Sequence, residues 1–335
     1  MSHFVVLVIG ENWEEQLAPY QENNMGDCPR EYMVFHNAEP EYREQWENEE
    51  IDMVIAPDGR ILHTWDKEFT KLDSTSARAM RDNVLSTGHS TYMQVIPEGF
   101  KIEKVPFNKV YPTFDQFMRD WARCGYSPEQ GAYGYWMNPN AKWDWYELGG
   151  RWTGFFTLKE GRVGSLGSPG LMTPPAEVGT ADQAKNGDID WEAMREEAGV
   201  EGGKHWDKFW NVARNLAPVS WRGMLKKHEG NIDVARKEYH NHPSVRALNS
   251  ANIYPGEDAW EKYGNDRQAY VEKCKKRAFA TFAVVKDGIW HEQGEMLMFG
   301  IVENEKNEDM WIIEWDELVG TTPDDTLFTI VDCHI

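Results

Sequence analysis

Residues 138–152 (NPNAKWDWYELGGRW) concentrate the side chains of this chain that are best suited to chemistry. Asp144 and Glu147 could serve as a general acid and base, or hold a metal ion. Arg151 could bind a phosphate or carboxylate group through two parallel hydrogen bonds. The aromatic rings could stack on a nucleobase or a sugar, and they belong to Trp143, Trp145, Tyr146 and Trp152. This segment is therefore a candidate catalytic or binding site for a ligand or a partner.

The same segment also fits a purely structural role. An aromatic strand that ends in Gly149-Gly150 can bend tightly and bury an arginine–acid pair without meeting any ligand. If the segment is an extended strand, its side chains alternate between two faces. That alternation predicts Trp143, Trp145 and Glu147 on one face and Asp144 and Tyr146 on the other.

A glycine- and proline-rich stretch follows at residues 161–175, with a glycine at every third position from 161 to 170. Backbone amides in such a loop can bind phosphate, and the candidate residues are Gly164, Ser165, Gly167 and Ser168. The stretch lacks both the Gly-Lys-Ser/Thr of a P-loop and the glycine pattern of a dinucleotide-binding fold. A mobile surface loop is therefore the favoured interpretation.

Weaker groupings could bind a metal or supply a nucleophile. The His-Asn-His run at 240–242, and His205 with Asp207, lack the spacing of zinc motifs, so we expect no metal site. Cys333 next to His334 resembles part of a nucleophilic site, but a packed strand end is the simpler interpretation. One basic cluster is expected to be a solvated helix end, and it consists of Lys273, Lys275, Lys276 and Arg277.

The chain is strongly acidic, since 35 Lys and Arg residues against 56 Asp and Glu residues give a formal net charge of −21. A field of this sign repels phosphate backbones and anionic membranes, which argues against direct nucleic-acid binding and against a membrane partner. Two exceptions stay open: a local basic patch, and an acidic surface that imitates nucleic acid toward a basic protein. Solubility is the simplest consequence of the charge.

The four cysteines, at positions 28, 124, 274 and 333, form no C-x-x-C pair and are too few for a disulfide framework in 335 residues. The apolar run at 4–9 is too short for a signal peptide, and no apolar stretch is long enough to span a bilayer. We therefore expect a reduced, cytosolic protein. The sequence points to no particular cofactor.

Runs of β-branched residues predict strands, and apolar residues at helical spacing predict helices. The predicted strands are residues 4–9, 53–55, 60–64, 155–158, 281–285, 289–291, 296–302, 310–315 and 326–331. The predicted helices are residues 42–50, 113–125, 190–198, 205–216 and 263–279, with Thr113, and Asp188 or Asp190, as N-caps. Pro57-Asp58-Gly59 and Lys286-Asp287-Gly288 predict tight turns between strands.

Because the best strands lie at both chain ends and helices fill the middle, we expect an α+β fold. Its mixed or antiparallel sheet is built from both termini, with a largely helical insertion in the middle. The expected parts are an N-terminal α+β part at 1–160, a Gly/Pro-rich loop at 161–180, the helical insertion at 181–279, and C-terminal strands at 280–335 that complete the N-terminal sheet.

Four stretches resemble a family of bacteriophage and prophage proteins that has no established activity. They are the opening SHFVVLVIGEN, the segment NPNAKWDWYELGGRW, GLMTPPA with TADQAKNGDID, and the ending PDDTLFTIVDCHI. These marks occur at both ends and in the middle, so the resemblance covers most of the chain. It implies a phage or mobile-element product that acts in the cytoplasm of a bacterial host, and it assigns no role to any residue.

Two functions are compatible with these features. The first is an accessory protein that binds a bacterial host protein through an acidic, tryptophan-rich surface, to counter host defence or to modulate host machinery. The second is an enzyme for a nucleotide, or a nucleotide sponge, that uses Asp144, Glu147 and Arg151. A phage structural role has little support, because the chain has no repeats. Exposure of the aromatic rings is what would distinguish scaffold, pocket and partner surface.

Overall fold

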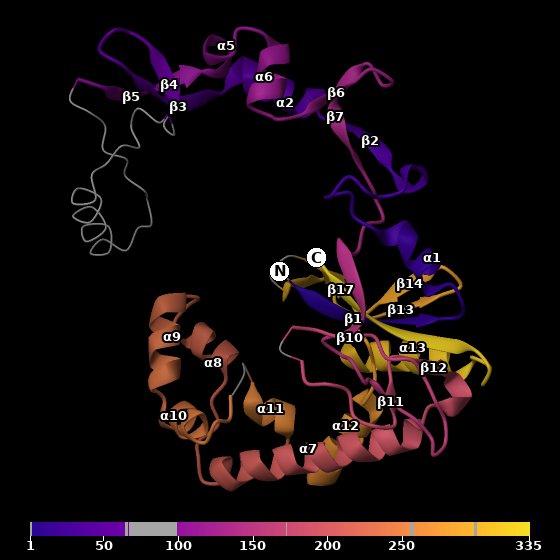
Figure 1. Cartoon of the computed structure of the whole chain (residues 1–335). Helices are drawn as coiled ribbons and strands as arrows, with labels where there is room; N and C mark the ends of the chain where they lie inside the picture. The colour runs from indigo at the N-terminus through magenta and orange to yellow at the C-terminus, as the bar shows by residue number, and fades with distance from the viewer. Residues whose placement is uncertain (1, 64–65, 67–98, 172, 255–257, 298–299) are drawn as a thin grey trace. The chain divides into compact units, whose positions relative to one another are not determined.

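The computed structural model describes residues 2–63, 66, 99–171, 173–254, 258–297 and 300–335. The chain forms two compact units, one of Met1–Tyr32 with Asn140–Ile335 and the other of Met33–Pro139 (Figure 1). The second unit lies wholly inside the part expected at 1–160. The two units thus have other boundaries than the parts expected from the sequence, because the sequence does not show which strands pair.

The larger unit is built on a mixed sheet whose strands come from both chain ends, as predicted. β1 and β13 run parallel, while β17 runs antiparallel to each of its neighbours. Across the sheet the order is β10 (Ser168–Pro169), β8 (Trp145–Gly150), β17 (Leu327–His334), β1 (His3–Ile9), β13 (Ala283–Lys286) and β14 (Ile289–Glu292), and β12 (Gln183–Lys185) also pairs with β17.

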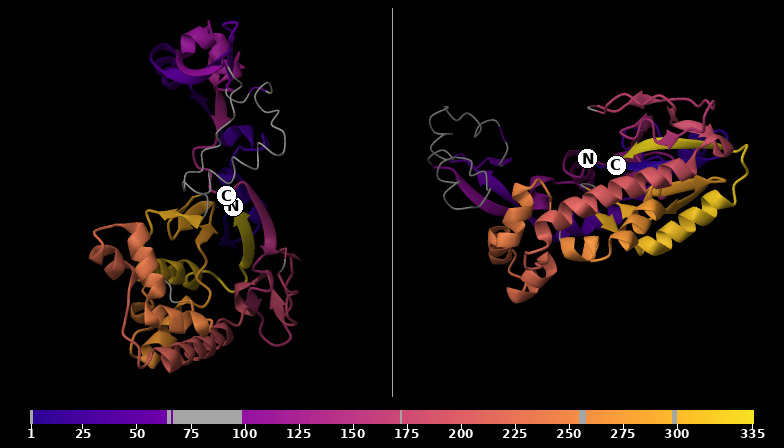
Figure 2. Two further views of the ribbon diagram at one scale, coloured as in Figure 1. Left: turned by 90° about the vertical axis from the view of Figure 1, so that its left-hand side faces the viewer. Right: turned by 90° about the horizontal axis from the view of Figure 1, so that it is seen from below.

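The central strand, β17, joins segments that are far apart in the sequence. One of its edges pairs with β1, from His3 opposite His334 to Ile9 opposite Phe328. Its other edge pairs with β12 near its start and with β8 near its end. Ser2 and Ile335 exchange two backbone hydrogen bonds of 3.1 Å. The two ends of the chain therefore lie side by side at one end of the sheet (Figure 2).

The middle of the larger unit is helical, as predicted (Figure 1). Asp190 caps the longest helix, since its carboxylate accepts the Ala193 N–H at 3.0 Å. The helices are α7 (Trp191–Ala213), α8 (Trp221–Lys227), α9 (Ile232–Asn241), α10 (Pro243–Ser250), α11 (Ala259–Tyr263) and α12 (Arg267–Arg277).

The predicted strand at 310–315 is wrong, because these residues belong to helix α13 (Glu308–Gly320). Its buried side chains are Trp311, Ile312, Trp315 and Val319, which follow helical rather than strand spacing. The Asn307 side chain caps the helix by accepting the Asp309 N–H. A short apolar run does not by itself distinguish a buried strand from a buried helix, and here the residues on either side decide.

Apolar side chains cover both faces of the main sheet. The first face carries Leu7 and Ile330 and packs against α13 and the first turns of α7 (Figure 2). The second face carries Val6 and Val331 and packs against α1 (Trp13–Leu17). Because strand residues alternate between faces, His3 and His334 extend the first face at the end of the sheet where the chain termini lie.

Short elements complete the larger unit. The predicted hairpin between β13 and β14 forms, with Asp287 and Gly288 at positive φ values of 54° and 73°, as a two-residue turn requires. Part of the predicted strand at 296–302 lies outside the described residues. The remaining elements are the 3₁₀ turns Ala18–Tyr20, Arg30–Tyr32 and Asn186–Asp188, the pair β9 (Phe156–Thr157) with β11 (Thr180–Ala181), and the pair β15 (Glu295–Met296) with β16 (Val302–Glu303).

The smaller unit contains two three-stranded antiparallel sheets, ordered β2-β7-β6 and β4-β3-β5. The predicted cap forms, since the Thr113 hydroxyl accepts the Gln116 N–H at 3.2 Å. Thr64, the last residue of a predicted strand, lies outside the described residues. The elements are β2 (Val34–Asn37), α2 (Glu39–Asn48), β3 (Glu50–Ile55), β4 (Ile61–His63), β5 (Lys101–Pro106), α5 (Phe107–Val110), α6 (Phe114–Asp120), β6 (Gly125–Ser127) and β7 (Ala132–Met137).

An aromatic core holds the smaller unit together. Phe107, Tyr111 and Phe117 are buried in mutual ring contact, with centroids 5.2 to 6.5 Å apart. Helix α2 packs Tyr42 and Trp46 against this core and leaves Glu41, Glu44 and Glu47 exposed. Among the described residues of the whole chain, none of the helices has both the length and the apolar character needed to cross a membrane.

Candidate functional site

Three side chains lie in a row across one end of the main sheet, on its first face. His3 on β1 is directly opposite His334 on β17, and His334 is directly opposite Trp145 on β8. The two imidazole centroids are 4.9 Å apart, and the Trp145 ring lies 5.6 Å from that of His3 and 5.8 Å from that of His334. Trp145 is 48% exposed. The row therefore places an open aromatic ring beside two partly buried histidines.

A carboxylate holds each histidine in this row. The Nδ1 atom of His3 lies 2.8 Å from Asp332, and the Nδ1 atom of His334 lies 2.6 Å from Asp144. A carboxylate can only accept a hydrogen bond, so Nδ1 donates in both pairs. The Nε2 atom of each ring is then left to exchange a proton with another group. Histidine with its Nδ1 held by an aspartate is the arrangement of a general acid–base catalyst.

The carboxylates of this row differ in how firmly they are held. Asp332 is 1% exposed, and its second oxygen accepts the backbone N–H of Arg151 at 2.9 Å. Asp144 accepts a further hydrogen bond from the Asn24 side-chain amide at 3.0 Å. Glu147 lies directly opposite Asp332, is partly buried, and has no hydrogen bond or ion pair within the part of the chain that the structure describes.

Only part of the tryptophan-rich segment faces this site. Trp143 is 4% exposed, and its indole N–H donates to the Leu17 carbonyl at 3.1 Å. Trp143 and Tyr146 pack together in the core of the second face. The prediction that Trp143 and Trp145 share a face is wrong, because β8 begins at Trp145 and a bend at Asp144 precedes it. Trp143 is therefore scaffold, and Trp145 is open to a ligand.

The two residues after the glycine pair have different roles. The Arg151 side chain is exposed and makes no hydrogen bond or ion pair with any described residue, while its backbone N–H holds Asp332. Trp152 packs, partly buried, against the core of the first face. Arg151 therefore remains available to an anion, and Trp152 belongs to the scaffold.

The glycine-rich loop is packed around a carboxylate of the protein itself. Asp182 is fully buried and accepts the N–H of Gly154 at 2.6 Å, the N–H of Gly167 at 2.8 Å and the hydroxyl of Thr153 at 3.0 Å. The Gly167 N–H, which was a candidate phosphate ligand, therefore donates to Asp182 instead. Asp182 accepts this N–H of the loop together with groups of the turn after β8, so the loop packs around a buried carboxylate of the protein itself.

The remaining phosphate-loop candidates also make backbone contacts. Ser165 exchanges backbone hydrogen bonds with Gln183, and Ser168 pairs with Gly149 as part of β10. A Cβ atom on Gly167 would lie 1.9 Å from the Leu148 carbonyl oxygen, which no real contact allows. Close approach of two backbones, rather than ligand binding, accounts for this glycine.

Burial changes the acid–base properties of groups around the row. Burial, and after it the Glu14 carboxylate, raises the pKa of Tyr146 to about 12. Burial also raises the pKa of the Cys333 thiol, and the charge of Asp332 adds to this effect. Burial and then the charge of Asp144 raise the pKa of Glu22. Tyr146 and Cys333 therefore stay protonated and neutral near pH 7.

The other groupings that the sequence suggested do not assemble into sites. Cys333 points into the core of the second face, whereas His334 belongs to the first-face row. The Asp207 carboxylate accepts two hydrogen bonds from the Arg267 guanidinium, of 3.0 and 2.9 Å. The His242 ring accepts the Ser244 N–H at the start of α10. No group of three or more His, Cys, Asp or Glu side chains among the described residues is arranged to hold a metal ion.

The basic cluster at the end of α12 is largely neutralised by acids. Lys273 lies 2.8 Å from Glu308, and Arg277 pairs with the same carboxylate at 2.5 Å. Lys275 pairs with Glu196 at 2.5 Å. Three of its four cations therefore join α12 to α7 and α13, while Lys276 is exposed and has no ion pair with any described residue.

The sequence singles out Asp144, Trp145 and Arg151 as candidates, and His334 only as a neighbour of Cys333; it does not indicate either histidine–carboxylate pair or the role of Asp182. A signal existed for the histidines, since position 3 continues the spacing of Val5 and Leu7, and position 334 that of Ile330. A polar residue in line with core positions indicates a side chain that is held by a partner. The partner itself could not be found, because it lies on another strand far away in sequence.

Comparisons with protein-family models, with curated proteins and with solved structures find no match for this chain. The assignment of a function therefore depends on the geometry of the row and on the surfaces of the two units.

We expect Gly167→Ala to destabilise the larger unit by roughly 1–3 kcal/mol, because the new methyl group must push Leu148 and the Asp182 contact apart. Thermal or urea unfolding of the purified protein measures this. Gly320→Ala is the matched control, since a Cβ there meets nothing within 4 Å at the end of α13. Equal stabilities of the two variants would contradict the packed loop.

We expect the native Cys333 thiol to react with iodoacetamide at pH 8 at least about tenfold more slowly than Cys274, which is only partly buried. Burial hides the sulfur of Cys333 and raises its pKa, so less thiolate is present at any pH below that value. Peptide mapping by mass spectrometry over time gives both rates. Unfolding in urea should make the two rates similar, and comparable native rates would show that Cys333 is accessible.

Proposed function

We propose that the protein is a nucleotide-binding enzyme of bacteriophage or prophage type that acts in the bacterial cytosol. The single observation that carries this proposal is the pair of histidine–carboxylate contacts beside an exposed tryptophan ring. Three of the stretches that resemble the phage and prophage family, the opening, the tryptophan-rich segment and the ending, supply these residues. Their convergence on one end of the sheet supports a functional role for it.

Trp145 is the binding element of the proposed site. Its ring is half exposed and held at the edge by two imidazoles, so a flat ligand can stack on it without displacing core residues. Every nucleobase has such a flat face, and stacking on an aromatic side chain contributes about 1–3 kcal/mol. Arg151 is six residues further along the chain and offers an unpaired guanidinium to a phosphate.

His3 and His334 are the catalytic elements. In a hydrolysis, Nε2 of one ring accepts a proton from the attacking water, and the other ring, entering in its protonated form, donates a proton to the leaving group. Asp332 and Asp144 hold the rings in the orientation for these transfers and stabilise each imidazolium as it forms. Such a pair contributes about 10²- to 10⁴-fold per proton transfer.

The charge of the site favours one type of bond. Three carboxylates lie beside the row: Asp332 and Asp144 contact the two histidines, and Glu147 is opposite Asp332 on the neighbouring strand. Carboxylates stabilise positive charge that develops in a transition state and oppose negative charge. Cleavage of the bond between a sugar and its base passes through a cationic, oxocarbenium-like state. The proposed reaction is therefore hydrolysis of an N-glycosidic bond in a nucleoside or nucleotide.

We expect Trp145→Ala to weaken binding of a nucleoside or nucleotide by about tenfold, because it removes the stacking surface. We expect His334→Gln to lower turnover at least about 100-fold while binding persists. Calorimetry measures binding, and chromatography of released bases from nucleosides, nucleotides and nicotinamide dinucleotide measures turnover.

Tyr126→Ala is the matched control for these variants, because Tyr126 is 55% exposed and lies in the smaller unit. Thermal unfolding checks that each variant is folded, and His3→Gln repeats the test on the other ring. The proposal fails if the wild-type protein neither binds nor cleaves any compound of these classes, or if Tyr126→Ala reproduces the loss seen with Trp145→Ala.

A second candidate function is binding of a bacterial host protein, and one surface of the smaller unit favours it. Val34, Tyr135 and Met137 share one face of β2 and β7 and are 50%, 49% and 37% exposed. His36 lies on the same face, with its ring 4.9 Å from Tyr135 and its Nε2 atom 3.2 Å from Glu41. The apolar strip thus adjoins the acidic helix α2.

The negative charge beside this surface indicates what kind of protein could bind to it. Residues 39–52 contain seven acids and a single arginine, and one of the exposed acids of α2, Glu41, contacts His36 on the face of the apolar strip. Apolar anchors surrounded by carboxylates fit a protein with a basic surface around an apolar patch. A host protein that binds nucleic acid has such a surface, and its occupation would counter host defence or modulate host machinery.

We expect a variant with Val34→Ser, Tyr135→Ser and Met137→Ser to lose a host protein that copurifies stoichiometrically with the tagged wild type from bacterial lysate. Ile289→Ser is the matched control, since Ile289 is 59% exposed on β14 of the larger unit. Quantitative mass spectrometry compares the three preparations. Equal recovery of the partner with the triple variant would place the binding surface elsewhere.

A further inference from the structure

Residues 214–254 differ in charge from the rest of the chain. They contain seven Lys and Arg residues and three Asp and Glu residues, so 7 − 3 gives +4, within a chain whose net charge is −21. The remaining residues therefore carry −25. This segment includes α8, α9 and α10, and it is a local exception to the acidic character of the protein.

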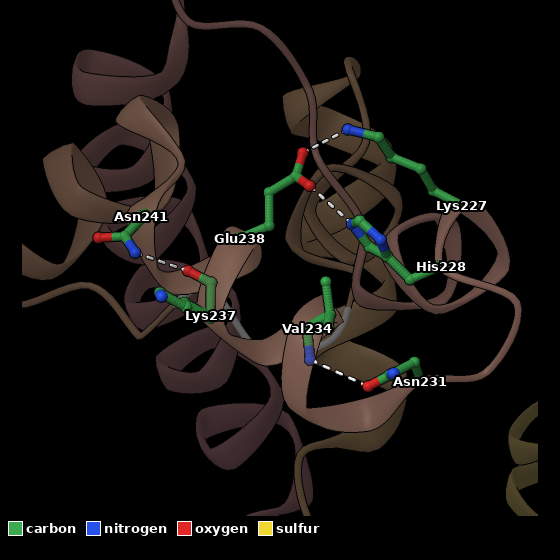
Figure 3. Close-up of polar contacts among 7 residues, drawn as sticks. All are labelled: Lys227, His228, Asn231, Val234, Lys237, Glu238 and Asn241. Atoms are coloured by element: carbon green, nitrogen blue, oxygen red, sulfur yellow. Dashed lines mark hydrogen bonds and ion pairs between the residues drawn. The ribbon is translucent and has the colours of Figure 1, made fainter.

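The three helices form a small packed group around their own apolar cluster. Met224 of α8, Tyr239 of α9 and Val245 of α10 are buried together. Glu238 joins α8 to α9, since its carboxylate pairs with Lys227 and lies 2.6 Å from Nε2 of His228 (Figure 3). Hydrogen bonds to Lys227 and then to His228 hold the pKa of Glu238 below its usual range. One of the three acids is thus neutralised by neighbours within the group.

Several cations of the group remain unused by the protein. Lys226 on α8, and Arg236 and Lys237 on α9, are exposed, and their side chains have no carboxylate partner among the described residues. His240 is exposed on α9 as well. Of the two other acids, Asp233 lies in the first turn of α9, where it favours the helix dipole, and Glu229 lies in the turn before it. The outward sides of α8 and α9 therefore present net positive charge.

An exposed aromatic ring follows this basic group in the chain. Tyr254 is 87% exposed, and it follows the end of α10 by four residues. Ile253 beside it is buried, which fixes the backbone at this point. Lys208 of α7 donates to the carbonyl of Asn252 at 3.1 Å, which places a further cation at the backbone two residues before Tyr254. Most tyrosines are at least partly buried, because the ring is largely apolar, and this ring is open to solvent.

We propose that the group of α8, α9 and α10, together with Tyr254, binds single-stranded nucleic acid. Lys226, Arg236 and Lys237 pair with successive phosphates, and a base stacks on Tyr254. A tyrosine ring can take a base only when that base is not paired inside a duplex, which is why a single strand fits better than a double helix. An acidic peptide would use the cations but would have no flat group for the ring.

The acidic remainder of the chain sets the conditions under which such binding occurs. At 0.1 M salt the screening length is about 10 Å, so charges farther away than this hardly oppose binding. Neutralising three or four phosphates predicts a slope of about −2 to −3 when the logarithm of the association constant is plotted against that of the salt concentration. At very low salt the −25 charge of the remainder reaches further, so affinity there rises less steeply.

The test is fluorescence anisotropy with labelled 12-nucleotide oligo-dT and oligo-U from 50 to 200 mM salt, using the full chain. We expect wild-type binding with the slope given above. The triple variant Lys226→Glu, Arg236→Glu and Lys237→Glu should bind at least about tenfold more weakly. Tyr254→Ala should weaken binding about five- to tenfold without changing the slope, because it removes stacking and no charge.

The matched control is Lys101→Glu, Lys104→Glu and Lys109→Glu, which makes the same charge change at exposed positions of the smaller unit. It should bind like the wild type within about twofold. Three results would overturn the proposal: no binding of either oligonucleotide at 50 mM salt, an equal loss in the control variant, or binding of polyglutamate as tight as that of the oligonucleotides. Circular dichroism confirms that the substituted surface residues leave the helices intact.

Discussion

The structure of the larger unit depends on one pairing, that of β17 between β1 on one edge and β8 with β12 on the other. Register in a sheet fixes which side chains are neighbours, since a shift of one residue would turn every side chain to the opposite face. This register places His334 between His3 and Trp145 and sends Cys333 into the core. The row of His3, His334 and Trp145 is thus a direct product of strand register, and Asp144, at the bend before β8, completes it by holding His334.

Two buried carboxylates stabilise the region where β17 changes partners. Asp182 lies between β11 and β12 and holds the turn after β8 and the glycine-rich loop, while Asp332 holds His3 and the backbone of Arg151. A buried carboxylate is tolerated only when hydrogen bonds replace its water, and these two have them. Because Asp332 also orients His3, this buried carboxylate links the polar core to the candidate site, and a change in one will affect the other.

The sequence predicted those features that depend on near neighbours. Thr113 and Asp190 cap their helices, Asp287-Gly288 forms the hairpin turn, and the β-branched runs at the two ends form one sheet, since local chemistry specifies each of these. Prediction from the sequence failed where a feature depends on residues farther away along the chain. Residues 310–315 are helical because Asn307 caps a helix before them and buried Val319 continues the helical spacing after them. The role of Asp144 depends on His334, which lies 190 residues away in the sequence. Pairing over such distances leaves no periodic trace in the sequence.

The separation of β1 from β17 has a consequence for synthesis. Loop-closure entropy makes contacts across 300 residues slow to form, and the ribosome delivers β1 long before β17 exists. Until then β1 and β13 together present an apolar edge with unpaired backbone groups, which is the kind of edge that aggregates. The strand pairs of the smaller unit and the contacts among α8, α9 and α10 join residues that are much closer in sequence, so they can form earlier. The nascent protein is therefore most vulnerable, and most in need of a chaperone, during the interval before its last strand arrives.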